Sequence, residues 1–351
     1  MPESNTANPG TINRQDWRDD ITLLEPQQTP HTSKISKVNE ASAMLVETFG
    51  DRLAPATITG NREGAAVGAG SNQLKDIKRF NAYQHFKQRD WAVTHHQQLI
   101  SSRGGLAGVA NAEDRSRARA ELLLKLDIET INCSNVETQD GGGGSADMLT
   151  RGAFKWLTPV GTALGSGTTL VDPSMQMPAD CQLLHGNNSG MLFSEDQLYQ
   201  VIKALATIRG TDEAFFGLFG FNVVETMDKM SRIATTNIIA NPGVLQTYTT
   251  RQNEDEYTIT LMVNIYKCSF GVIEVVKTVR NNWSDTTSSG DANAGLILDP
   301  DLWYLDMLED MHEAATFGPQ TGNATKSGGT VQATWVHLCR SPRGNGVIKQ
   351  S

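Results

Sequence analysis

Residues 112–132 read AEDRSRARAELLLKLDIETIN, and this stretch decides much of the fold. Most of its residues have high helix propensity. Asn111 can cap the first turn, with Asp114 at the reciprocal position. The first half of the stretch is charged, whereas the second half carries Leu and Ile residues around much of the circumference. We therefore expect one long helix that is exposed at its N-terminal end and buried at its C-terminal end.

The sequence before this helix predicts extended structure. Residues 1–40 are polar, contain four prolines and show no sustained periodicity, which is typical of an arm with one short helical turn. Residues 56–80 are rich in Gly, Ala, Asn and Thr, and alternation begins at Asn81. Two extended stretches joined by a polar, Gly-rich tip at residues 61–80 predict a long hairpin-like loop.

A second helix and an aromatic strand are expected further along the chain. Ser194 and Gln197 form a capping box before an apolar set at helical spacing, and Gly210 closes that helix. Residues 215–221 read FFGLFGF. This segment could be an exposed patch for a partner, but a core strand with close-packed turns is the favoured interpretation.

The C-terminal half alternates between strand and helix signals. Strict alternation predicts a half-buried strand at 257–265, and residues 272–277 predict another. Pro300 suits a first helical position, so a third helix through about Ala315 is expected. Residues 331–348, VQATWVHLCRSPRGNGVI, predict a final strand and a turn.

Composition limits the classes of function. The 351 residues are 38% hydrophobic and include 32 glycines, so a modest core with arms and loops is expected. The net charge of −9 argues against a protein whose main task is to grip nucleic acid, because phosphate contacts need clustered Lys and Arg. No signal peptide and no apolar run of about 18 residues is visible, so we expect no membrane span.

No catalytic, cofactor or metal site is expected. The segment GGGGSAD at 141–147 lacks the Gly-Lys-Ser/Thr end of a phosphate loop. His95 and His96 would point to opposite faces of a strand. Four widely spaced cysteines form neither a zinc pattern nor a redox motif. Helix capping and a solvated helix face explain the remaining candidate acids, which are Asp299, Asp301, Glu309 and Asp310.

The order of short motifs resembles the tailed-phage major capsid (major head) proteins with the HK97-like fold. The motifs cover roughly residues 29–348, each short and placed in the order of that family. They are Thr29-Pro30, Phe49-x-Asp51-x-Leu53-Ala54-Pro55, Glu63-Gly64, Asn81-x-Tyr83-Gln84, Val93-Thr94, Lys125-Leu126-Asp127-Ile128-Glu129, Arg151-Gly152, Phe270-Gly271, Leu298-Asp299-Pro300, Thr321-Gly322 and Asn345-Gly346-Val347-Ile348.

The resemblance implies an α+β, HK97-like capsid fold with five parts. These are an N-terminal arm (1–50), an extended loop (51–100), a peripheral domain with a long spine helix (101–190), a mainly axial domain (191–300) and a return to the peripheral domain (301–351). It implies a structural protein, not an enzyme, that assembles into the icosahedral head around the DNA genome. The candidate contacts of the loop with a neighbouring subunit are Arg62, Glu63, Lys75, Asp76, Lys78 and Arg79.

The resemblance also implies partners and leaves alternatives open. Expected partners are copies of the chain in pentamers and hexamers, portal, scaffold or decoration proteins, and packaged double-stranded DNA contacted weakly. Assembly would take place in the host cytoplasm, and the mature location would be the virion. An encapsulin-like nanocompartment shell is the first alternative. An enzyme on a mixed α/β domain and a tail or decoration protein are the others.

Overall fold

The structure is a computed structural model of the chain. It describes residues 28–35, 38–51, 58, 62–64, 77–97, 112–141, 146–157, 176–184, 192–210, 213–238, 252–253, 256–257, 265–283, 291–317 and 326–350. Two compact units interleave along the sequence. One unit comprises 1–27, 88–124 and 311–332, and the other comprises 28–87, 125–310 and 333–351. The five-part division expected from the sequence stays a prediction.

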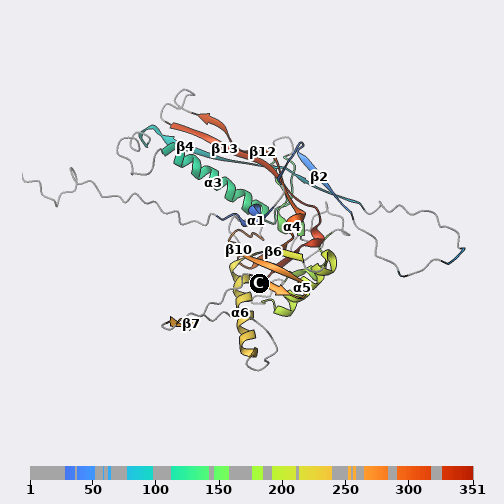
Figure 1. Cartoon of the computed structure of the whole chain (residues 1–351). Helices are drawn as coiled ribbons and strands as arrows, with labels where there is room; N and C mark the ends of the chain where they lie inside the picture. The colour runs from blue at the N-terminus through green and yellow to red at the C-terminus, as the bar shows by residue number, and fades with distance from the viewer. Residues whose placement is uncertain are drawn as a thin grey trace, which may run out of the picture. The chain divides into compact units, whose positions relative to one another are not determined.

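The second unit contains a six-stranded sheet, of which Figure 1 labels β6 and β10. Its order is β5 (Gln182–Leu184), β14 (Gly346–Lys349), β11 (Ala294–Leu298), β6 (Glu213–Phe219), β10 (Gly271–Lys277) and β9 (Ile265–Cys268). β6 pairs with β10 in parallel and with β11 antiparallel. Phe215, Phe216 and Phe219 are buried, so the prediction of a core strand in the aromatic segment is confirmed.

The second predicted helix is also confirmed. In α5 (Glu195–Arg209), the Ser194 side chain accepts from the Gln197 N–H while the Gln197 side chain accepts from Ser194. Gly210 follows with φ of 105°, a conformation that favours glycine. α6 (Phe221–Ile238) begins directly after β6, and Phe221 itself is exposed. The short strands β7 (Gln252–Asn253) and β8 (Glu256–Tyr257) pair with each other.

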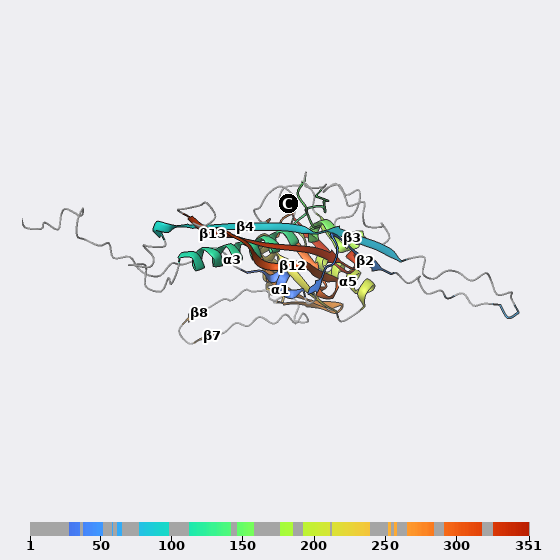
Figure 2. The ribbon, with the colours of Figure 1, turned by 90° about the horizontal axis from the view of Figure 1, so that it is seen from above.

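A four-stranded sheet has the order β1 (Val38–Glu40), β12 (Trp303–Phe317), β13 (Lys326–Cys339) and β4 (His85–Thr94). Figure 2 shows β4 and β13 running side by side. β1 pairs with β12 in parallel. The final strand and turn are confirmed as β13, a 3-10 turn at Pro342–Gly344 and β14.

The prediction of a helix from Pro300 to Ala315 is wrong. Pro300–Leu302 forms a single 3-10 turn, and Trp303–Phe317 continues as β12. The Leu, Met, Glu and Ala residues of this stretch favour a helix locally, but strand pairing on both sides overrides that weak preference.

The long helix is confirmed as α3 (Ala112–Asn132). Its N-terminal half is largely exposed or half-buried, whereas Leu124, Leu126 and Ile128 are buried. The expected short helical turn of the arm is α1 (Pro30–Lys34). The proposed cap Asn111, the centre of the Gly-rich segment (142–145) and most of the predicted strand 257–265 lie outside the described residues.

The predicted hairpin consists of β2 (Leu45–Gly50) and β3 (Lys78–Tyr83), which pair antiparallel from Leu45 with Tyr83 to Gly50 with Lys78. Its tip is shorter than residues 61–80, because residues 78–80 belong to β3. Phe80 and Ala82 are fully buried. Burial of these two side chains holds β3 in place. It explains why the strand begins at Lys78, inside the polar segment 61–80.

Candidate assembly surfaces

The β2–β3 ribbon has one buried face and one exposed face. On the buried face, the Phe80 ring meets the Trp156 ring edge-on with centroids 6.4 Å apart. Trp156 belongs to α4 (Ala153–Leu157), and its indole N–H donates to the His337 carbonyl at 3.2 Å. The ribbon is therefore anchored to the rest of its own unit by aromatic packing.

The outer face of the ribbon carries an exposed apolar side chain, Phe49, beside an ion pair. Phe49 is 61% exposed although it is a large aromatic residue. The Arg79 guanidinium lies 5.9 Å from the centre of the Phe49 ring and 3.4 Å from a Glu47 carboxylate oxygen. An exposed ion pair of this kind contributes about 0–1 kcal/mol to folding, so stability of the subunit does not explain the arrangement.

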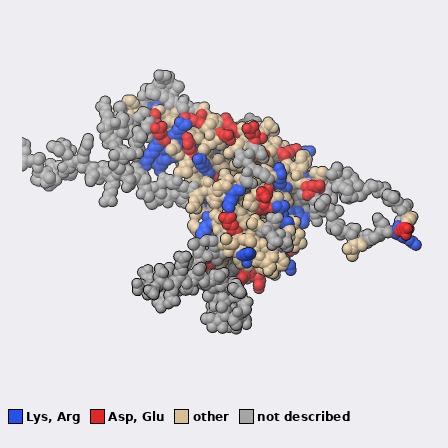
Figure 3. All heavy atoms as spheres, viewed as in Figure 1, with Lys and Arg blue, Asp and Glu red and all other residues tan. Residues whose placement is uncertain are grey.

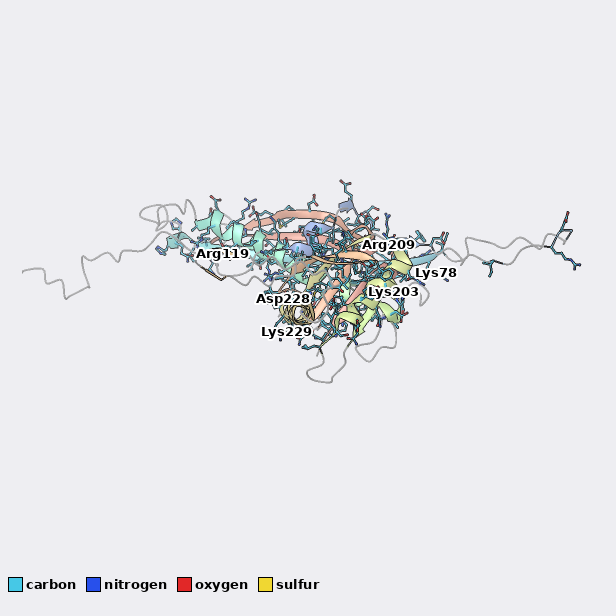
Figure 4. All side chains as sticks on the ribbon, turned by 60° about the horizontal axis from the view of Figure 1, so that its bottom comes forward. Lys78, Arg119, Lys203, Arg209, Asp228 and Lys229 are labelled. Carbon is cyan, nitrogen blue, oxygen red and sulfur yellow. The ribbon has the colours of Figure 1, made fainter. Side chains whose placement is uncertain are left out.

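The structure places four of the six candidate loop contacts. Arg62 and Glu63 are exposed, and Gly64 beside them has φ of 75°. Arg79 and Lys78, which Figure 4 labels, lie on β3. Lys75 and Asp76 lie outside the described residues. The chosen charges thus fall into a group near Gly64 and a group at the start of β3.

A partly buried ion pair lies in the same unit as the ribbon. Arg151 is fully buried, its Nε donates to a Glu137 carboxylate oxygen at 2.7 Å, and its guanidinium stacks over Trp156 at 4.3 Å. Burial is the largest influence on the pKa of Arg151 and lowers it, and Glu137 opposes that change. A β-carbon on the adjacent Gly152 would lie 2.2 Å from the Ser134 carbonyl oxygen, so only glycine fits this close approach.

The N-terminal helix α1 is anchored by Glu129 of α3. One carboxylate oxygen accepts the His31 N–H at 2.7 Å, and the other accepts the Thr32 N–H at 2.8 Å and the Thr32 hydroxyl at 2.5 Å. Glu129 is fully buried. Burial raises its pKa, and the hydrogen bonds from Thr32 and His31 together with nearby Arg280 limit that rise.

An aromatic cage encloses the His31 ring. Nε2 of His31 lies 3.0 Å from Nε2 of His337. The His337 ring stacks on Trp303 at 4.8 Å with an interplanar angle of 14°, and His31 meets Trp303 edge-on. Burial lowers the pKa of His31 to about 3. Burial also lowers the pKa of His337, and His31 adds to that effect.

The solvent side of α1 makes a separate contact. The Lys34 ammonium lies 2.7 Å from a Glu274 carboxylate oxygen of β10 and 5.4 Å from the centre of the Phe216 ring. Contacts from α3, β6, β10, β12 and β13 therefore converge on three residues of α1, which are His31, Thr32 and Lys34. The sequence missed this site because its partners are far apart along the chain. The one available signal in the sequence was Glu129, a carboxylate in the apolar half of α3 that would need a hydrogen-bonding partner when buried.

Charge is mixed over the described surface. Figure 3 shows acidic and basic side chains interspersed on the visible face. Arg117 of α3 pairs with Glu121 at 3.2 Å and with Glu313 at 3.4 Å. On α6, Lys229 pairs with Glu225 at 2.6 Å. The described side chains on this face therefore form no broad basic surface for a nucleic acid.

The described residues contain no group of three or more His, Cys, Asp and Glu side chains that could hold a metal ion. His95 and His96 are exposed, with ring centres 6.5 Å apart. Asp299 caps the 3-10 turn by accepting the Asp301 N–H at 3.0 Å, as its position before Pro300 predicted. The four cysteines are free. No described helix has the length and apolarity that a membrane span requires.

One open groove of about 460 Å³ is lined partly by apolar side chains. Met44 and Phe86 on its wall are exposed to 51% and 42%. The polar lining consists of His85, Lys87, Asp140 and Asp147. Burial is the main reason that the pKa of His85 falls to about 4; Lys87 adds to the fall and Asp127 opposes it.

Comparisons with known proteins agree with this architecture. The family model for the SU10 major capsid protein matches residues 4–350. The capsid of cyanophage A-1(L) has a similar fold, with a TM-score of 0.68 at 12% identity over 99% of each chain. The capsid of a native GTA particle gives 0.56 at 11% identity over 100% of each chain. The capsid of the Myoviridae phage XM1 gives 0.50 at 10% identity over 97% of this chain and 100% of that chain. No curated protein matches the sequence.

The family match decides between the expected shell types. It names a major capsid protein, and the matched folds include capsids of phages, which favours the phage head over the encapsulin-like compartment. The expected fold, an α+β HK97-like capsid fold, is confirmed. The chain is a major capsid protein that forms the icosahedral head of a tailed phage, and it belongs to the SU10 major capsid protein family.

Proposed function

We propose that copies of this chain close into pentamers and hexamers, and that the loop after β2 reaches across a neighbouring subunit in each ring. Rings of identical copies arise from heterologous contacts that close after a fixed number of subunits. The observation that carries the proposal is the ribbon itself, which is buried on the Phe80 face and exposed on the Phe49 face.

The loop offers side chains that have no role in the core of their own subunit. Ile58 is fully exposed, and Arg62 and Glu63 are exposed beside Gly64. Exposed apolar and charged side chains in one loop suit an interface with a buried centre and a polar rim. The residues proposed to contact the neighbour are Arg62, Glu63, Lys75, Asp76, Lys78 and Arg79.

The groove at Met44 and Phe86 supports a second contact between copies. Its apolar wall is open in the single subunit, and another copy of the chain is the occupant that fits a shell built from one protein. Repetition of modest contacts in every subunit would stabilise the particle. Each interface need bury only the standard area of about 1,600 Å².

Other partners belong to the same proposal. The net charge of −9 and the mixed surface fit weak, non-specific contact with packaged double-stranded DNA. Portal, scaffold or decoration proteins are further proposed partners, with assembly in the host cytoplasm. We propose a structural role without catalysis.

Deleting residues 61–74 tests the proposal, because β2 and β3 stay intact. The melting temperature of the unassembled subunit should change little, since loop tips tolerate change when their backbone is not buried. The yield of particles on sedimentation should fall. Lys203→Ala is the control, because this exposed residue lies on α5 (Figure 4) and should change neither quantity. Normal particle yield from the deletion variant would show that the loop does not join subunits.

A further inference from the structure

Helix α1 is held by contacts that concentrate on two side chains. The backbone N–H groups of His31 and Thr32 donate hydrogen bonds to the Glu129 carboxylate. The His31 ring contacts both the His337 ring and the Trp303 ring. Beyond these, Lys34 makes a partly exposed ion pair with Glu274, which contributes little in water. The attachment of the helix therefore depends chiefly on Glu129 and on the cage.

The protons in the cage can be assigned from its contacts. Nδ1 of His337 lies 3.2 Å from the Arg151 carbonyl oxygen, and because that oxygen can only accept, Nδ1 carries the proton. Nε2 of His337 is then an acceptor, so Nε2 of His31 donates across the 3.0 Å contact. Both rings are neutral in this arrangement.

A positive charge in the cage would have no compensating partner. The contacts of the two rings are with each other, with Trp303 and with the Arg151 carbonyl. The charged groups on the surrounding elements are already engaged: Glu129 with α1 and near Arg280, and Lys34 with Glu274. An enclosed imidazolium without a partner is strongly disfavoured.

We propose that α1 is a proton-sensitive latch, which holds the N-terminal segment on the subunit at neutral pH and releases it in acid while the six-stranded sheet stays folded. Release exposes His31 and His337 to water, where each ring can take up a proton. Protonation then keeps the rings out of the cage.

The sign of the effect follows from proton linkage. Burial keeps the pKa of each docked histidine below 6.5, so the released form binds more protons as pH falls below 6.5. At pH 5 each solvated histidine favours release by about 30-fold. Glu129 acts in the opposite direction because its docked pKa is raised. One carboxyl binds at most one proton, whereas the two released histidines together bind nearly two at pH 5, so release is still favoured as pH falls below 6.5.

Hydrogen exchange of the purified full-length chain tests the latch. The reporters are the amides of His31, Thr32, Ser33 and Ile35, which all donate hydrogen bonds in docked α1. After correction for intrinsic exchange, their protection should fall at least about tenfold between pH 6.5 and pH 5. Amides of β6 should remain the better protected group at both values.

Variants separate the latch from a general effect of acid. His31→Gln keeps a donor for His337 but cannot be protonated, so its loss of protection should be several-fold smaller. His96→Gln removes an exposed histidine and should behave like the parent chain. Unchanged protection of α1 at pH 5, or exchange of α1 and β6 at one common rate, would overturn the proposal.

Discussion

The Glu129 carboxylate accepts the backbone N–H of His31 at 2.7 Å, and this bond ties the N-terminal helix to the C-terminal end of α3. Glu129→Ala removes the acceptor and leaves the His31 and Thr32 N–H groups without their partner. Each buried donor left unsatisfied costs about 1–3 kcal/mol. We expect a loss of about 3 kcal/mol in the free energy of unfolding, measured by denaturant titration of the unassembled subunit.

Glu121→Ala is the matched control on the same helix. Glu121 pairs with Arg117 at the surface, so its removal should change stability by less than about 1 kcal/mol. Equal effects of the two substitutions would show that docking of α1 does not stabilise the subunit.

Gly152→Ala should be severely destabilising. The added β-carbon would lie 2.2 Å from the Ser134 carbonyl oxygen, and backbone cannot move aside as a flexible side chain can. We expect a loss of at least about 3 kcal/mol, comparable to the worst cases of overpacking, seen as insoluble protein or a much lower melting temperature. Gly64→Ala has open space around it and should cost about 1 kcal/mol, from backbone conformation alone.

Acid should destabilise the subunit through His85 as well as through the cage. Burial holds the pKa of His85 at about 4, below the unfolded value of about 6.5. Stability from this group is complete above pH 6.5 and falls by up to about 1.4 kcal/mol per pH unit between 6.5 and 4. His85→Gln should make the dependence of unfolding free energy on pH less steep in that range. An identical slope in the variant would exclude His85 as a contributor.

Binding of DNA by the free subunit should be weak. Ion pairs such as Arg117 with Glu313 and Lys229 with Glu225 already engage surface cations, and the chain carries a net charge of −9. We expect micromolar or weaker affinity that falls with added salt and ignores sequence. Fluorescence anisotropy with two unrelated duplexes measures this, and nanomolar binding to one duplex alone at physiological salt would contradict it.

Elements with a strong local signal could be predicted from the sequence. The reciprocal bonds of Ser194 and Gln197 define the start of α5, and the phenylalanines of β6 occupy the core as their pattern indicated. The stretch after Pro300 could not be predicted in this way. Its composition favours a helix, and its pairing with β1 and β13 depends on residues far away in the sequence.

The candidate assembly surfaces and the buried cage were predicted unevenly for the same reason. The charges near Gly64 stand out in a polar, Gly-rich segment. The cage of His31, His337 and Trp303 gives no local pattern, because the fold alone brings these residues together. Phe49 would be expected in the core because it is a large aromatic residue. Its exposure follows from the fold, in which Phe80 occupies the buried face of the ribbon.

Negative-stain electron microscopy of the purified protein tests the central claim most directly. The chain, alone or with a scaffold partner supplied, should form closed icosahedral particles of uniform size built from pentamers and hexamers. The proportion of subunits in particles should rise with protein concentration. Only monomers or small dimers across a range of salt and protein concentrations, with scaffold partners present, would contradict the account.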